Sequence, residues 1–264
     1  MLATINGISL NYDVSGAASG APVVLHHPLA TRLGFWDELT AALAPRYRVI
    51  RFDARGHGRS DAPATPYDFP MLCADVTGLM DHLGIARAAF VGLSMGGMVG
   101  QYLGVLHPDR VSSLVLVSTT SRIPPEMRPM WSDRVGVVRK GGMASQVGPA
   151  MDRWITAANR AARPDLVARL SAMIADTPPD GYIGWCHAIG GLDVTEQLKT
   201  ITTPTRVIVG AEDPSMPPAV AQVIHETING SELVVMPAVS HQLALEDPAS
   251  FHGHVLEFLA RQPG

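Results

Sequence analysis

The segment Ala88-Ala-Phe-Val-Gly92-Leu-Ser94-Met-Gly96-Gly97 joins an apolar run to a stretch with helical spacing that begins at Met95. A Gly-x-Ser-x-Gly motif between a strand and a helix is typical of a nucleophile elbow, a sharp turn that presents a serine hydroxyl. Glycines suit such a turn because they carry no Cβ where the backbone approaches itself closely. We therefore expect Ser94 to project into the crevice at the carboxyl end of its strand, beside the positive end of the next helix.

The segments on either side of this motif alternate between two kinds of pattern. Short apolar runs predict buried or half-buried strands at residues 2–5, 8–14, 23–25, 47–52, 88–91, 111–117, 205–209 and 232–236. Stretches with helical spacing separate most of them, at residues 36–43, 71–83, 95–106, 219–228 and 248–259. This alternation predicts an α/β fold with a mostly parallel sheet flanked by helices, which a hairpin at Asn6-Gly7 opens.

The alternation stops between Ser121 and about Thr200, where the segments are helical and no convincing strand occurs. Prolines mark both ends of this region. We predict a helical cap at 121–200, inserted after the sixth strand into a core of residues 1–120 and 201–264. An independent domain is the alternative, but a cap over the core explains why the strands resume afterwards.

The composition indicates a globular chain. Hydrophobic residues make up 47% of the 264 residues and charged residues 17%, which supports a large buried core and argues against disorder. The formal net charge is −4, and the only lysines are Lys140 and Lys199. Such a surface has no basic stripe to neutralise phosphates, so we expect no nucleic-acid partner.

The sequence lacks the patterns of targeting and membrane-spanning segments. The first residues show no charged segment followed by an apolar one, and no run reaches the roughly 20 apolar residues that a membrane span needs. We expect a cytoplasmic protein that does not bind membranes, and the sequence leaves a homo-oligomer open. Cys73 and Cys186 lie far apart in the chain, which in an intracellular enzyme is more typical of two reduced thiols than of a disulfide.

A serine nucleophile needs a base that takes its proton and a group that orients the base. Of the ten histidines, His241 suits the base, because it lies in a loop between the strand that ends at Met236 and the last helix. From there it can reach back over the sheet. Asp213 directly follows the strand at 205–209, so we predict that its carboxylate orients His241. Glu212 is its nearest rival.

Acyl transfer also needs N–H donors for the oxyanion, one from the residue after the nucleophile and one from a loop after an earlier strand. Met95 supplies the first. The second comes from His26-His27-Pro28-Leu29-Ala30, where we choose Leu29 because Pro28 has no N–H. The two adjacent histidines should point to opposite faces of an extended strand, which argues against a shared metal ion. We expect neither a metal nor a cofactor.

Together these motifs resemble those of the α/β-hydrolase superfamily. The matching segments, spread over nearly the whole chain, are Asp53-Ala-Arg-Gly-His-Gly-Arg-Ser60, Gly92-Leu-Ser-Met-Gly-Gly97, Gly210-Ala-Glu-Asp213 and His241. Within the superfamily the chain is most similar to 3-oxoadipate enol-lactonases. That similarity rests on the elbow and on three cap segments, Trp131-Ser-Asp-Arg134, Arg153-Trp-Ile-Thr156 and Thr177-Pro-Pro-Asp-Gly-Tyr182. The cap segments are more specific than the elbow, which many unrelated hydrolases share.

The resemblance implies hydrolysis of an anionic five-membered enol-lactone to 3-oxoadipate in aromatic-compound breakdown, by a Ser-His-Asp triad without a cofactor. Trp131 and Arg134 match a tryptophan and an arginine of the family's cap, and a guanidinium facing the site would suit a substrate carboxylate. A solvated helix face or an ion pair to the core is the alternative for Arg134. Other large apolar cap residues are expected to bury the cap on itself rather than line the site: Met127, Met130, Trp154 and Met173.

Two segments depart from the lactonase pattern. His27-Pro28-Leu29-Ala30 stands where these enzymes usually have Asn-Ser-Leu-Gly, and His241 is followed by Gln242-Leu-Ala rather than Leu-Ser-Asn. Another carboxylesterase or lactonase, or a carbon–carbon bond hydrolase, is therefore an alternative, because fold and triad do not separate these reactions. A non-catalytic ligand-binding protein is disfavoured because all three triad residues are present. Dehalogenase and epoxide-hydrolase chemistry is disfavoured because those relatives have aspartate in place of Ser94.

Overall fold

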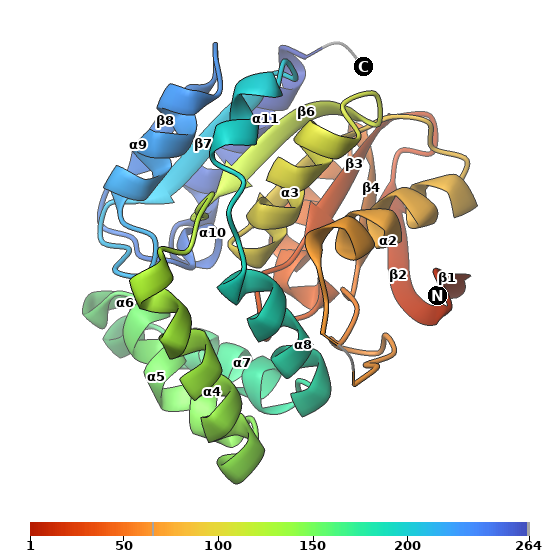
Figure 1. The fold of residues 1–264 in the computed structure, drawn as a ribbon. Coiled ribbons are helices and arrows are strands. Elements are labelled where there is room, and N and C mark those ends of the chain that lie inside the picture. The colour runs from red at the N-terminus through yellow and green to blue at the C-terminus, as the bar shows by residue number, and fades with distance from the viewer. Residues whose placement is uncertain (65, 263–264) are drawn as a thin grey trace.

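The computed structural model describes residues 1–64 and 66–262, and its centre is an eight-stranded sheet (Figure 1). The strand order is β1-β2-β4-β3-β5-β6-β7-β8. Strands β1 and β4 each pair antiparallel with β2, and the other neighbours are parallel, so the predicted mostly parallel sheet is confirmed. The strands are β1 (Leu2–Ile5), β2 (Ile8–Gly16), β3 (Ala21–His26), β4 (Tyr47–Phe52), β5 (Ala88–Leu93), β6 (Val111–Val117), β7 (Thr205–Gly210) and β8 (Glu232–Met236).

The central strands are mostly apolar because helices cover both faces of the sheet. Every residue of β5 and of β7 is buried, whereas the edge strand β1 alternates exposed and buried residues. On one face α1 (Asp37–Leu43) packs against α11 (Pro248–Ala260). The other face carries α2 (Phe69–His82), α3 (Met95–Leu106) and α9 (Pro218–Thr227) (Figure 1).

The predicted helices and strands of the core agree with the observed ones to within two residues at each end. Helix α2 begins at Phe69 rather than at the predicted Met71. Its first turn accommodates Pro70, because a proline there removes an N–H that has no helical partner, and Asp68 caps it by accepting a hydrogen bond from the Met71 N–H at 2.8 Å. Helix α10 (Leu243–Glu246) was not predicted, because four residues are too short to show a period.

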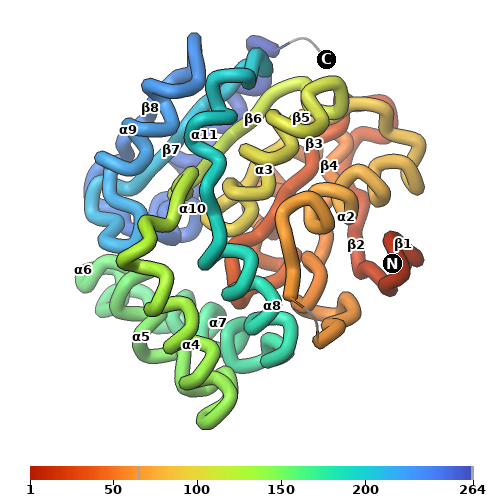
Figure 2. Tube along the Cα trace, viewed as in Figure 1, coloured from red at the N-terminus to blue at the C-terminus, as the bar shows by residue number. Residues whose placement is uncertain are grey.

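Five α-helices lie between β6 and β7 and group together at one end of the sheet (Figure 2). We call them the cap helices: α4 (Arg128–Gly141), α5 (Ala144–Trp154), α6 (Ala157–Ala162), α7 (Pro164–Ala175) and α8 (Pro179–Gly190). The chain enters and leaves this group side by side, since the Ile123 N–H donates to the Leu192 carbonyl at 2.9 Å. The boundaries at 121 and 200 stay a prediction from the sequence.

Two further features follow from the described residues. Cys73 and Cys186 are both buried and are not joined in a disulfide. Across residues 1–64 and 66–262, none of the helices has both the length and the apolar character that crossing a membrane requires.

Candidate active site

Ser94 lies in the turn between β5 and α3 with a φ of 54°, a left-handed conformation that is strained for a residue with a Cβ. Hydrogen bonds hold both its backbone N–H and its backbone carbonyl. The Ser94 N–H donates to the Val117 carbonyl at 2.8 Å, and the Thr119 hydroxyl donates to the Ser94 carbonyl at 2.9 Å. The strained turn therefore lifts the Ser94 side chain out of the sheet at the carboxyl end of β5.

The glycines around Ser94 are required by close backbone contacts. A Cβ at Gly92 would overlap the Gly96 carbonyl, and a Cβ at Gly96 would overlap the carbonyl of His26 at the end of β3. Strands β3 and β5 are neighbours between which the strand order reverses, and such a switch point is a preferred place for a ligand site. The Gly-x-Ser-x-Gly motif thus lets the elbow close against β3.

The structure joins two of the predicted site residues directly. The His241 Nδ1–H donates to the Asp213 Oδ2 at 2.7 Å, and both side chains are buried. The other carboxylate oxygen of Asp213 accepts hydrogen bonds from the N–H groups of Ser215 at 2.8 Å and Met216 at 2.9 Å. The rival Glu212 is exposed. Because every oxygen of Asp213 has a set partner, His241 is held with Nε2 free to accept a proton.

The two predicted oxyanion donors lie at the start of α3 and in the loop after β3. Within the described chain, neither the Leu29 N–H nor the Met95 N–H donates to another group. The next N–H along, that of Ala30, is occupied by the His57 Nε2 at 3.0 Å, and Pro28 has none. Of these three residues, Leu29 is therefore the one whose N–H is available to a ligand.

Three buried histidines lie in or next to the Leu29 loop, and two of them link it to the loop after β4. His27, in the loop after β3, accepts a hydrogen bond at Nε2 from the Ala54 N–H at 3.0 Å, while His57, in the loop after β4, accepts one from the Ala30 N–H. Each loop thus supplies an imidazole to the other. The expectation that His26 and His27 point to opposite faces is wrong, because the strand ends at His26 and the ring centroids lie 5.6 Å apart.

Burial keeps these imidazoles neutral. Desolvation lowers the pKa of His26 to about 3, and it also lowers the pKa values of His27 and His57. A protonated Nε2 on His57 would face the Ala30 N–H with a second donor, so only the neutral form fits. In residues 1–64 and 66–262 no group of three or more His, Cys, Asp or Glu side chains is placed to hold a metal ion.

The free energy of unfolding should fall steeply in acid. These histidines titrate near pH 6.5 when unfolded but only at lower pH when folded. Above pH 6.5 they are neutral in both states. Below it the unfolded chain binds protons that the folded chain does not, so stability is lost as the pH falls, by up to about 1.4 kcal/mol per pH unit for each histidine. Urea denaturation between pH 7 and pH 4.5 measures this slope.

The matched control for the acid experiment is His57→Gln, whose amide oxygen can still accept the Ala30 N–H. In this variant the free energy of unfolding should fall less steeply with pH, by about 1.4 kcal/mol per pH unit, because one proton fewer is taken up on unfolding. Equal slopes in the variant and the wild type would mean that His57 is not kept neutral by the fold.

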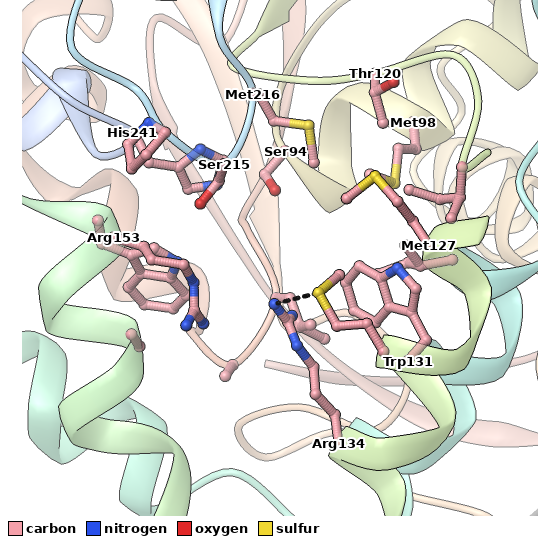
Figure 3. Close-up of a pocket in the computed structure, with 18 of the residues that line it drawn as sticks. Ser94, Met98, Thr120, Met127, Trp131, Arg134, Arg153, Ser215, Met216 and His241 are labelled. Atoms are coloured by element: carbon pink, nitrogen blue, oxygen red, sulfur yellow. Dashed lines mark hydrogen bonds between the residues drawn. The ribbon is translucent and has the colours of Figure 1, made fainter. Parts of the chain in front are cut away.

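Ser94 and His241 face a cavity of about 280 Å³ between the core and the cap helices (Figure 3). Leu29, Trp131 and Arg134, all predicted for the site, also line it. The Arg134 guanidinium lies over the Trp131 ring at 4.4 Å from its centroid. In the described chain Arg134 has no carboxylate within ion-pair distance, so the ion pair considered for it is absent, and its half-buried side chain lines the cavity.

Several residues that line the cavity were not predicted from the sequence. Arg153, at the end of α5, projects into the cavity across from Arg134 and also lacks a carboxylate partner among the described residues (Figure 3). Burial and the charge of Arg134 lower the pKa of Arg153. Most of the large apolar cap residues expected to bury the cap on itself line the cavity instead: Met127, Met130 and Trp154. Met173 is buried and lies outside the residues lining it.

A reason for these misses lies in the cap. Helical spacing identifies which residues share a face of a helix, but it does not say whether that face meets another helix or a cavity. Arg153 lies in a segment that resembles the lactonase cap, which was the one signal that could have selected it.

Comparison with known proteins agrees with the fold seen in the structure. A family model described as the alpha/beta hydrolase fold matches residues 21–248. The 3-oxoadipate enol-lactonase 2 of Acinetobacter baylyi is 35% identical over 259 residues, which cover 98% of this chain and 96% of that protein.

Two solved structures extend the comparison. The enol-lactonase from Burkholderia xenovorans LB400 superimposes with a TM-score of 0.95 at 36% identity, covering 99% of this chain and 100% of that one. A thermophilic esterase from Thermogutta terrifontis, described as malate bound, superimposes with a TM-score of 0.93 at 27% identity, covering 99% and 98%.

Proposed function

Because the chain belongs to the alpha/beta hydrolase family, we propose that it is a serine hydrolase that opens an anionic enol-lactone of the 3-oxoadipate type through an acyl-enzyme. One observation carries the proposal: Ser94 and His241 share a cavity with two arginines that have no carboxylate partner in the described chain. The names of the Acinetobacter and Burkholderia relatives support a lactone as the ester that is opened.

In the first half-reaction the Ser94 Oγ attacks the lactone carbonyl and passes its proton to the His241 Nε2. Asp213 stabilises the imidazolium that forms, through its 2.7 Å hydrogen bond to Nδ1. The carbonyl oxygen becomes an oxyanion and accepts hydrogen bonds from the Leu29 and Met95 N–H groups. The ring C–O bond then breaks, and the leaving oxygen takes the proton from His241.

The second half-reaction regenerates the enzyme. The enol released by ring opening tautomerises to a ketone, which makes the opening hard to reverse. His241 then removes a proton from water, which attacks the acyl-enzyme, and the same proton returns to the Ser94 Oγ as the ester bond breaks. The product carries a second carboxylate at the carbon that was the lactone carbonyl.

The cap supplies the residues that select a substrate by its charge. Arg134 on α4 and Arg153 on α5 place two guanidiniums on the cavity wall, and the lowered pKa of Arg153 reflects burial and the positive charge of Arg134. An anionic substrate would relieve this unfavourable arrangement by forming charge-assisted hydrogen bonds in a partly desolvated site. A neutral ester of the same size would leave both cations unpaired.

The alternative is another carboxylesterase or lactonase, or a carbon–carbon bond hydrolase, of the same fold. The similarity to the Thermogutta esterase is the observation that supports an esterase as the alternative. A non-catalytic binding protein is tested separately by an organophosphonate, which should form a covalent adduct on Ser94. Absence of an adduct on the folded protein would favour the binder.

The deciding experiment compares kcat/KM for 3-oxoadipate enol-lactone with that for its neutral methyl ester, with ring opening as the readout. We expect a preference for the anion on the order of 10³, because two charge-assisted contacts are worth roughly 4 kcal/mol together. The double variant Arg134→Met, Arg153→Met should lose most of this preference and keep its rate on the methyl ester.

The control for charge selection is Arg128→Met, an exposed arginine at the start of α4 that lies outside the cavity lining. It should leave the preference unchanged. Comparable rates on both lactones that still depend on Ser94 would contradict the lactonase assignment and make the protein a different esterase or lactonase.

A further inference from the structure

The loop that carries His241 is attached to the end of cap helix α5. The Ser240 hydroxyl donates to the Arg153 carbonyl at 3.1 Å, and the Gln242 N–H donates to the Trp154 carbonyl at 2.9 Å. Both chain neighbours of His241 therefore bind the last two residues of α5, and both of those residues line the cavity. The Trp154 and His241 ring centroids lie 6.4 Å apart.

Glu246 makes a second attachment between this loop and the cap. One of its oxygens accepts hydrogen bonds from the Thr156 N–H at 2.7 Å and the Asn159 side-chain amide at 2.9 Å, at the junction of α5 and α6. The other accepts the Ser240 N–H at 2.6 Å. A single buried carboxylate, 7% exposed, thus joins the cap to the residue before His241.

The chemistry of the side chain explains why a carboxylate stands here. All three partners are neutral donors, and no Lys, Arg or His of the described chain forms an ion pair with Glu246. An ionised carboxylate accepts at both oxygens, whereas an amide would turn an NH₂ group toward donors on one side. The charge therefore allows one side chain to hold two segments at once, without forming a salt bridge.

We propose that Glu246 is a positioning residue that sets His241 and the Arg153 end of α5 at a fixed distance, so that substrate binding in the cap and orientation of the base are coupled. The inference rests on the proposed function, since it assigns His241 as the base and Arg153 as an anion-binding residue. Glu246 itself does not line the cavity.

The test is Glu246→Gln, assayed on the enol-lactone and its methyl ester after the active fraction has been titrated with an organophosphonate. Loss of the hydrogen bonds at one oxygen of residue 246 should raise KM for the anionic lactone about 10-fold, because Arg153 moves. It should also lower kcat on both substrates about 10-fold, because His241 moves. A role in stability alone would lower the active fraction and leave KM and kcat per active site unchanged. That result would overturn the inference.

Two further variants complete the design. Asn159→Ala removes one donor and keeps the carboxylate, so it should change KM and kcat in the same direction by less, and it serves if Glu246→Gln does not fold. Arg163→Met is the matched control, because it removes a different cap contact, from Arg163 to the Leu245 carbonyl at 2.6 Å. Equal changes in Arg163→Met and Glu246→Gln would overturn a specific role for Glu246. Wild-type rates in Ser94→Ala would overturn the proposed function instead.

Discussion

Ser94→Ala should lower kcat for lactone opening by about 10⁶, the loss usually found when the nucleophile of a serine triad is removed. The alanine should fold normally, because the contacts that hold the turn run through the backbone of residue 94, at the Val117 carbonyl and the Thr119 hydroxyl. The measurement is a steady-state assay of ring opening, with the midpoint of thermal unfolding recorded for both proteins.

The control for this variant is Ser112→Ala. Ser112 is a half-buried serine near the start of β6, at the opposite end of the sheet from the cavity. It should keep wild-type kcat and KM. Activity in Ser94→Ala within about tenfold of wild type would rule out the acyl-enzyme mechanism, because removal of the nucleophile leaves only binding and oxyanion stabilisation.

Asp213→Asn should lower kcat by about 10⁴ with little change in KM. The N–H groups of Ser215 and Met216 both donate to one oxygen of residue 213, so the asparagine must keep its carbonyl there and turn its NH₂ toward His241. The His241 Nδ1 then has to accept, which places the ring proton on Nε2, and the ring can no longer take a proton from Ser94.

Glu212→Gln tests whether the loss belongs to Asp213 alone. Glu212 is exposed and adjacent in sequence, and it was the rival for the same role. The variant should retain wild-type kcat. Equal losses in Glu212→Gln and Asp213→Asn would show that the charge of the loop matters rather than the hydrogen bond to His241.

The core of the fold was predictable because its signals are local. Apolar runs and helical spacing gave strands and helices to within two residues, since central parallel strands are buried on both sides and their composition shows it. The misses included a four-residue helix and the proline-containing first turn of α2, where too few residues carry a period.

The candidate site was predictable to the extent that chain order places it. Ser94, Asp213 and His241 each follow a parallel strand of one sheet, and the carboxyl ends of such strands meet at one edge. Composition and spacing could therefore identify all three residues as candidates for the site. They could not show that Asp213 rather than Glu212 meets His241, because neighbouring residues of a loop differ only in where the folded chain turns them.

The sequence by itself determined the sheet, the elbow and the strand-end loops of this protein, because each depends on the residues next to it. Only the tertiary structure decided that Arg153 faces Arg134 across a cavity, and that Glu246 joins the cap to the His241 loop. The hydrogen bond between Thr156 and Glu246 spans 90 positions of the chain. Contacts of that kind depend on how the cap helices dock on the core, and local periodicity carries no information about docking.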